Sequence, residues 1–312
     1  MFNRYLTYYS PAMQFVVFCA LVSMCWLLGG TIYDLLNVNM TGLNSSQIAE
    51  LTTYDYPLAQ KLKWINGIIQ IVMLLLPAAI FTYLAYPSPA TYAGLKKPQP
   101  IKYLAFGILM LLVALPFSSW LEQLNSLIHF GGEIKKMDAK YTALAGAMLA
   151  GTSIQDLIVN TLLICILPAF VEEIFFRGCL QQIMVNWMQK TPLLAVFLVA
   201  LLFSLFHGQL SGLIPRTFLG LLLGLAYYYT GSLWVSMAMH VVNNFFAVLF
   251  FFLYQSHRIS FNILETPDTP IWLGLLSGGI TAAFIYMLYQ MRRPYEIFAL
   301  IPDEPKPTNE TP

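Results

Sequence analysis

Two adjacent acids and an arginine lie inside an apolar stretch in the third quarter of this sequence. Residues 167–178 read LPAFVEEIFFRG. Glu173 and Arg177 are four residues apart with the acid first, the favourable order for an ion pair on one helix face. Glu172 points about 100° away from that face. We therefore expect Arg177 to pair with Glu173 and Glu172 to be available as a general base. The simpler alternative is that both acids mark a helix end at the membrane surface.

Two histidine-containing segments follow within 72 residues of Glu172. In FSLFH, Phe203 and His207 are four residues apart at the end of an apolar run. In HVVNN, His240 and Asn244 are one helical turn apart and project from the same face. His207 alone could be an ordinary interfacial histidine, and a His–Asn pair could be a hydrogen-bonded contact between membrane helices.

The elements that carry these residues must be membrane helices. Of the 312 residues, 58% are hydrophobic and only 10% are charged, against roughly 25% charged in soluble domains. A spanning helix needs about 20 mostly apolar residues. Such runs predict an all-α fold, a polytopic membrane bundle of about eight transmembrane helices, at residues 13–33, 64–86, 103–120, 156–180, 192–207, 213–230, 233–254 and 271–291. An ionisable residue within such a span costs about 2.5–3.5 kcal/mol and is by default a candidate functional residue.

Helix geometry predicts which of these residues can meet. The runs 156–180 and 192–207 form a hairpin that turns near Thr191, with Glu172 19 residues before that turn and His207 16 residues after it. At 1.5 Å per residue their depths differ by about 4–5 Å. His240 and Asn244 match this depth less well, and helix tilt would have to close the gap.

The remaining sequence predicts the organisation around this centre. We divide the chain into N-terminal helices and loops (1–150), a catalytic core (151–255) and a last helix with a polar tail (256–312). The loop 121–155 is long enough for an amphipathic helix, and the tail from Asp303 has a composition typical of disorder. We interpret the first helix as retained and not as a cleaved signal peptide. Eight spans place both termini on one side, and nine of the 16 basic residues fall there, which favours the cytoplasm. The net charge of +1 gives no indication of a nucleic-acid partner.

The three motifs together resemble the CPBP family, which includes the CAAX prenyl endopeptidases and the bacterial Abi proteins. The family pattern EExxxR, FxxxH and HxxxN occurs here at Glu172–Arg177, Phe203–His207 and His240–Asn244. The resemblance implies an intramembrane endopeptidase. Its catalytic residues would be Glu172 and His207, which activate water, with His240 and Asn244, which stabilise the oxyanion; Glu173, Arg177 and Phe203 would support them.

The resemblance leaves the cofactor open. Glu172, His207 and His240 could instead bind Zn²⁺ and activate a metal-bound water. No HExxH motif is present. We favour water activated without a metal, because we expect Arg177 to occupy Glu173 and so leave few acids to orient the imidazoles.

The partners and the class of function follow from the same resemblance. The expected partners are the lipid bilayer and a membrane-anchored protein or peptide, such as a prenylated CAAX protein, and the expected location is the bacterial inner membrane. The alternative to an enzyme is a non-catalytic Abi-like scaffold or a peptide-toxin immunity protein. A transporter is disfavoured because paired broken helices are not evident.

Overall fold

The computed structural model describes residues 6, 8–95, 100–265 and 268–292, and every regular element among them is a helix. Seven helices are long and apolar enough to cross a membrane: Pro11–Thr41, Tyr56–Ala85, Ile101–Ser126, Ile154–Trp187, Leu210–Thr230, Leu233–Gln255 and Ile271–Gln290. The predicted all-helical membrane bundle is confirmed. The run predicted at 192–207 forms the shorter helix Pro192–Phe206, whose 15 residues fall below the usual spanning length. The predicted disordered tail lies outside the described residues.

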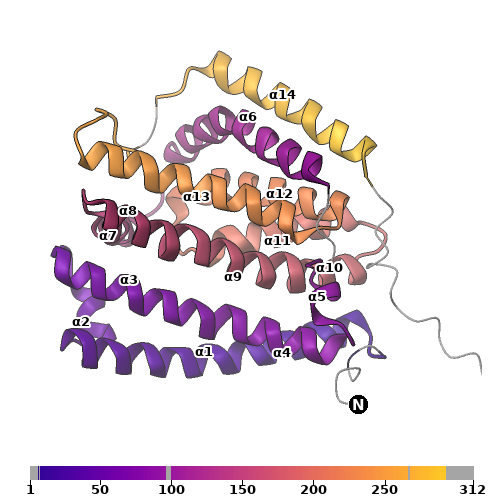
Figure 1. The fold of residues 1–312 in the computed structure, drawn as a ribbon, viewed down its shortest axis with the longest axis horizontal. Coiled ribbons are helices and arrows are strands. Elements are labelled where there is room, and N and C mark those ends of the chain that lie inside the picture. The colour runs from indigo at the N-terminus through magenta and orange to yellow at the C-terminus, as the bar shows by residue number, and fades with distance from the viewer. Residues whose placement is uncertain (1–5, 7, 96–99, 266–267, 293–312) are drawn as a thin grey trace, which may run out of the picture.

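Most of the helices lie roughly along one direction (Figure 1). α1 (Pro11–Thr41) packs against α3 (Tyr56–Gln70) and α4 (Leu76–Ala85), while α6 (Ile101–Ser126) packs against α14 (Ile271–Gln290). Between these pairs lie α9 (Leu167–Phe175), α10 (Gln182–Trp187), α11 (Pro192–Phe206), α12 (Leu213–Thr230) and α13 (Leu233–Gln255). The start of α1 and the end of α14 lie at the same end of the bundle (Figure 1), as an even number of passes requires.

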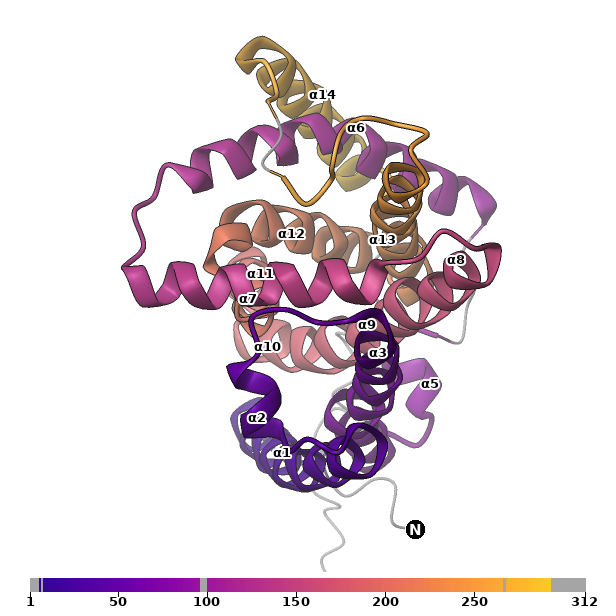
Figure 2. The ribbon, with the colours of Figure 1, turned by 90° about the vertical axis from the view of Figure 1, so that its left-hand side faces the viewer.

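The predicted helix in the loop 121–155 is present as α7 (Gly132–Leu149). Figure 2 shows α7 lying across the end of the bundle opposite the start of α1 and the end of α14, with α2 (Ser45–Glu50) and the start of α8 (Ile154–Asn160) beside it. We call this end the α7 end. α7 contacts α3, α8, α13 and the short helical turn Leu210–Gly212. It therefore packs against the segment that follows His207.

The segment from Ile154 to Trp187 is one continuous helix of 34 residues with two π-helical turns, Thr161–Ile166 and Phe176–Gln181. Such turns insert an extra residue into the helical repeat and are frequent at functional sites. The second begins three residues after Glu173 and contains Arg177. Arg177 and Gln181 are both completely buried, and they donate hydrogen bonds to the carbonyl oxygens of Gly220 at 3.0 Å and Gly224 at 2.9 Å.

The glycines of α12 make this contact feasible. A Cβ atom at Gly224 would lie 2.8 Å from Val196 and 2.9 Å from the Gln181 side chain. Small residues at such spacing let two membrane helices approach until side chains of one reach the backbone of the other. The sequence LGLLLG therefore brings α12 close enough to bind the helix that carries the two acids.

The chain turns sharply after α11. Gly208 has φ +69°, a left-handed conformation that glycine adopts at little cost. A Cβ atom there would lie 3.3 Å from the Tyr141 hydroxyl on α7. His207 therefore ends a short helix and faces inward at a tight turn that α7 covers.

Candidate active site

Glu173 is the centre of the buried polar group. Its Oε1 accepts a hydrogen bond from Arg177 Nη1 at 2.6 Å and another from His240 Nδ1 at 2.9 Å. The Glu173 and Arg177 side chains are completely buried. Arg177 also lies over the ring of Phe203, 4.5 Å from its centroid. The predicted ion pair is confirmed. The expectation that Arg177 would occupy Glu173 alone is wrong, because the same carboxylate also orients His240.

Glu172 points to the other side of His240. Its side-chain atom Oε2 lies 3.9 Å from His240 Nε2 and has no hydrogen-bond partner among the described residues. The residue is only 7% exposed. A buried carboxylate oxygen without a partner is costly, and such atoms are uncommon outside functional sites. The two adjacent acids thus have different environments, as their 100° separation on the helix predicts.

Hydrogen bonds assign the tautomers of both histidines. His240 Nδ1 faces the Glu173 carboxylate, and His207 Nδ1 lies 2.8 Å from the carbonyl oxygen of Phe203. Both oxygens can only accept, so each Nδ1 carries a hydrogen and donates it. Each neutral imidazole therefore has its lone pair on Nε2. It follows that His240 can donate a hydrogen bond through Nε2 only when it is protonated.

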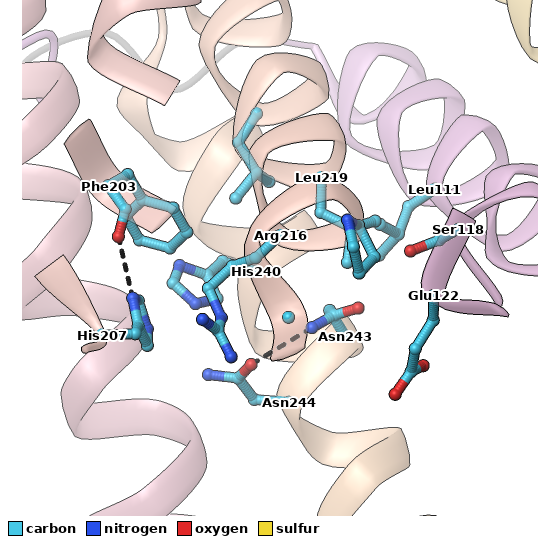
Figure 3. Close-up of a pocket in the computed structure, with 13 residues that line it drawn as sticks. Leu111, Ser118, Glu122, Phe203, His207, Arg216, Leu219, His240, Asn243 and Asn244 are labelled. Carbon is cyan, nitrogen blue, oxygen red and sulfur yellow. Dashed lines mark hydrogen bonds between the residues drawn. The ribbon is translucent and has the colours of Figure 1, made fainter. Parts of the chain in front are cut away.

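The second and third motifs meet at a cavity of about 250 Å³. In Figure 3, His207, His240, Asn243 and Asn244 surround its centre. Asn243 Nδ2 donates to Asn244 Oδ1 at 3.3 Å, which leaves the Asn244 amide nitrogen available as a donor. The polar residues of the wall are Ser118, Glu122, His207, Arg216, His240, Asn243 and Asn244. Glu172 is not among the described residues that line this cavity, but His240 both lines it and contacts Glu172.

The sequence interpretation did not single out the residues that hold the segment after His207. Asp138 on α7 accepts hydrogen bonds from the backbone N–H groups of Leu210 at 3.2 Å and Ser211 at 2.8 Å. Asn125 on α6 donates to the carbonyl oxygens of the same two residues, each at 2.9 Å. These contacts join elements 70 or more residues apart in sequence. A local pattern carries no signal for them.

Arg216 and Glu122 on the cavity wall were also not predicted as site residues. Arg216 lies in the predicted run 213–230, so the rule that flags ionisable residues within spans would have found it. Glu122 is two residues beyond the predicted run 103–120, where an acid normally indicates only a helix end. Figure 3 shows the Arg216 side chain close to those of His240 and Asn244.

The Zn²⁺ alternative requires Glu172, His207 and His240 to share one coordination sphere. Within the described part of the chain, no group of three or more His, Cys, Asp and Glu side chains is arranged to hold a metal ion. The hydrogen bond from His240 to Glu173 does resemble the second-shell contact that orients a ligand imidazole. The metal-free reaction and the Zn²⁺ alternative therefore both stay predictions, and we derive no step through a metal.

Comparison with known families agrees with this geometry. Residues 154–246 match the family described as Type II CAAX prenyl endopeptidase Rce1-like. The match covers less than a third of the chain, and it contains all three motifs and Arg216. No curated protein and no solved structure matches the chain. The predicted relationship to the CPBP proteases is confirmed for this segment, and at the family level it supports a membrane protease of the CAAX type.

Proposed function

Proceeding from a type II CAAX prenyl endopeptidase domain at residues 154–246, we propose that this protein hydrolyses a peptide bond of a membrane-anchored substrate with water activated by Glu172. The observation that carries the proposal is the Glu172 carboxylate: it is buried, its Oε2 has no hydrogen-bond partner among the described residues, and it lies 3.9 Å from an imidazole that faces the cavity. Neighbouring Glu173 accepts hydrogen bonds from Arg177 and His240 through Oε1, whereas Glu172 Oε2 accepts none from the described residues. A purely structural role would have no need of a second buried acid beside this pair.

The proposed reaction begins with proton transfer from water. Glu172, with the Nε2 lone pairs of His240 and His207 as nearby acceptors, takes a proton from a water molecule that attacks the scissile carbonyl carbon. When His240 receives the proton, Glu173 stabilises the resulting imidazolium through Nδ1–H, as the buried acid of a catalytic triad does. The proton then passes to the leaving nitrogen as the carbon–nitrogen bond breaks. His207 is oriented for its part by the Phe203 carbonyl oxygen.

The oxyanion of the tetrahedral intermediate needs hydrogen-bond donors. Asn244 offers its amide nitrogen, because Asn243 donates to its oxygen. Protonated His240 offers Nε2–H in the same wall of the cavity. Removing one such donor costs about 10²–10³ in rate in other acyl-transfer enzymes. The proton that leaves the attacking water can therefore charge His240, and charged His240 can then donate a hydrogen bond to the oxyanion.

A second cavity supports a lipid-anchored substrate. It has a volume of about 570 Å³ and shares Ser118, Glu122, Leu219 and Asn243 with the catalytic cavity. Its remaining wall combines aromatic and aliphatic side chains from α6, α13 and the segment before α14, including Leu115, Phe246, Phe250 and Phe261, with the polar residues Ser119, Asn262, Glu265 and Asp268. An apolar chain such as a prenyl group would lie along the aromatic side chains while the attached peptide enters the catalytic cavity. We place the protein in the bacterial inner membrane on the same family resemblance.

The test is proteolysis in detergent or liposomes with a fluorescence-quenched, S-farnesylated CAAX peptide. Glu172→Gln should lower the rate by about 10²–10⁴, the usual contribution of a general base. Glu133→Gln is the matched control, because that acid is highly exposed on α7. Wild-type activity in the Glu172→Gln variant would refute the proposal. If wild type cleaves no membrane-anchored peptide, the scaffold or immunity alternative gains support.

A further inference from the structure

Two arginines lie in the membrane-spanning part of the catalytic core, and their contacts differ. Arg177 donates hydrogen bonds to Glu173 and to the Gly220 carbonyl oxygen and lies over the ring of Phe203. Within the described part of the chain, Arg216 makes two long hydrogen bonds, both to Gln209: Nη1 to its carbonyl oxygen at 3.3 Å and Nη2 to its Oε1 at 3.4 Å. None of the ion pairs among the described residues includes Arg216.

The acids around Arg216 contact other groups or form no ion pair with it within the described residues. Glu172, Glu122 and Asp138 are the carboxylates whose charges act on Arg216. Asp138 uses both oxygens on the backbone N–H groups of Leu210 and Ser211. Glu172 faces His240, and Glu122 forms no ion pair within the described residues. The charge of Arg216 is therefore balanced at a distance and not by contact.

The cavity places this cation beside apolar walls. Arg216 lies on the same cavity surface as His207, His240 and Asn244, opposite Leu111 on α6 and next to Leu219 on α12. A volume of about 250 Å³ is below the 300–1,000 Å³ of typical small-ligand pockets. The cavity is therefore small and suits the terminal residue of a peptide, with a cation for an anionic group and apolar surface for a side chain.

We propose that Arg216 binds the C-terminal carboxylate of the substrate peptide and so sets the protein's preference for cleavage near a free chain end. The inference rests on the proposed function and goes beyond it, since it assigns the specificity for a carboxylate to one side chain. The planar guanidinium presents parallel N–H groups that match the two oxygens of a carboxylate. An oxyanion is a single oxygen and does not need this paired geometry, because the amide of Asn244 and protonated His240 can donate hydrogen bonds to it.

The experiment compares two fluorescence-quenched peptides that end in an S-farnesylated cysteine followed by valine, isoleucine and methionine. One ends in the free carboxylate and the other in the carboxamide. Wild type should cleave the acid about 10–100-fold more efficiently, the range for a charge-assisted hydrogen-bonded pair. Arg216→Gln should remove this preference by slowing cleavage of the acid alone. Arg216→Lys keeps the charge without the planar fork and should retain part of the preference, which also guards against a folding defect. Arg258→Gln, at an exposed position after α13, is the control.

A binding measurement separates this inference from the proposed function. The tripeptide valyl-isoleucyl-methionine, as free acid or as amide, is added to purified protein and thermal unfolding is recorded. The acid should stabilise wild type and not Arg216→Gln, and the amide should stabilise neither. Acid-specific stabilisation without cleavage of any peptide would leave the inference standing and overturn the proposed function. Equal cleavage of both peptides by wild type, or equal slowing of both by Arg216→Gln, would overturn the inference and leave the function. Loss of both cleavage and acid-specific stabilisation would overturn both.

Discussion

Replacing Arg177 should destabilise the protein far more than neutralising Glu172, although both residues belong to the same motif. In Arg177→Met the Glu173 carboxylate, which is completely buried, loses the guanidinium 2.6 Å away and keeps the hydrogen bond from His240. The Gly220 carbonyl also loses its hydrogen bond from Arg177. Leaving one charge of a buried pair uncompensated costs about 3–5 kcal/mol. At about 2–4 °C for each kcal/mol in larger chains, Tm should fall by about 6–20 °C.

Glu172→Gln is the matched comparison because it changes the adjacent acid in the same helix. The Glu172 Oε2 atom has no hydrogen-bond partner, so the neutral amide removes an uncompensated charge and breaks no contact at that oxygen. We expect its Tm to stay within about 3 °C of wild type, since substitutions that disturb no such feature usually change stability by less than about 1 kcal/mol.

A double variant isolates the interaction between the paired charges. Glu173→Gln combined with Arg177→Met should be more stable than the sum of the two single changes predicts, by about 0.5–3 kcal/mol. Thermal unfolding in detergent, followed by tryptophan fluorescence, measures wild type and the four variants. If Glu172→Gln proves the least stable, the structural and catalytic roles of the two acids have been exchanged and the reasoning fails.

Three further predictions concern the topology, the metal and the contact between α7 and the segment after His207. Reporter fusions at Gln99 and Lys306 should give the same cytoplasmic signal and a fusion at Asn44 the opposite one; matching signals at Asn44 and Gln99 would contradict the path of the second spanning helix. Exhaustive chelation should leave activity intact, whereas stoichiometric zinc whose removal abolishes activity would establish the metal mechanism. His240→Ala should lower the rate by about 10²–10³ if the reaction is metal-free, and if zinc is required it should also remove the bound metal. Asp138→Asn keeps its shape but weakens the hydrogen bonds to the segment after His207, so activity should fall about tenfold, equivalent to about 1.4 kcal/mol, with little change in Tm; an unchanged rate would show that α7 does not position that segment.

The sequence alone predicted the membrane bundle, the three motifs and the Glu173–Arg177 pair. Each of these depends on local order: a run of apolar residues is long enough to span or it is not, and two residues four apart share a helix face in any packing. The presence of a helix within the loop 121–155 was also expected from its length and composition. The depth estimate for Glu172 and His207 came from counting residues along a hairpin, which is again a local property.

Only the tertiary structure decided how these parts act on one another. Counting residues left His240 too far from the level of Glu172, yet in the folded chain it lies between the two acids, with Glu173 on one nitrogen and Glu172 near the other. That position depends on how α13 packs against α9, 67 residues away in sequence. The same holds for Arg216, whose role depends on which acids come close enough to pair with it. The sequence determines the type and charge of each residue, but a contact with a residue of a distant helix forms only when the two helices pack together.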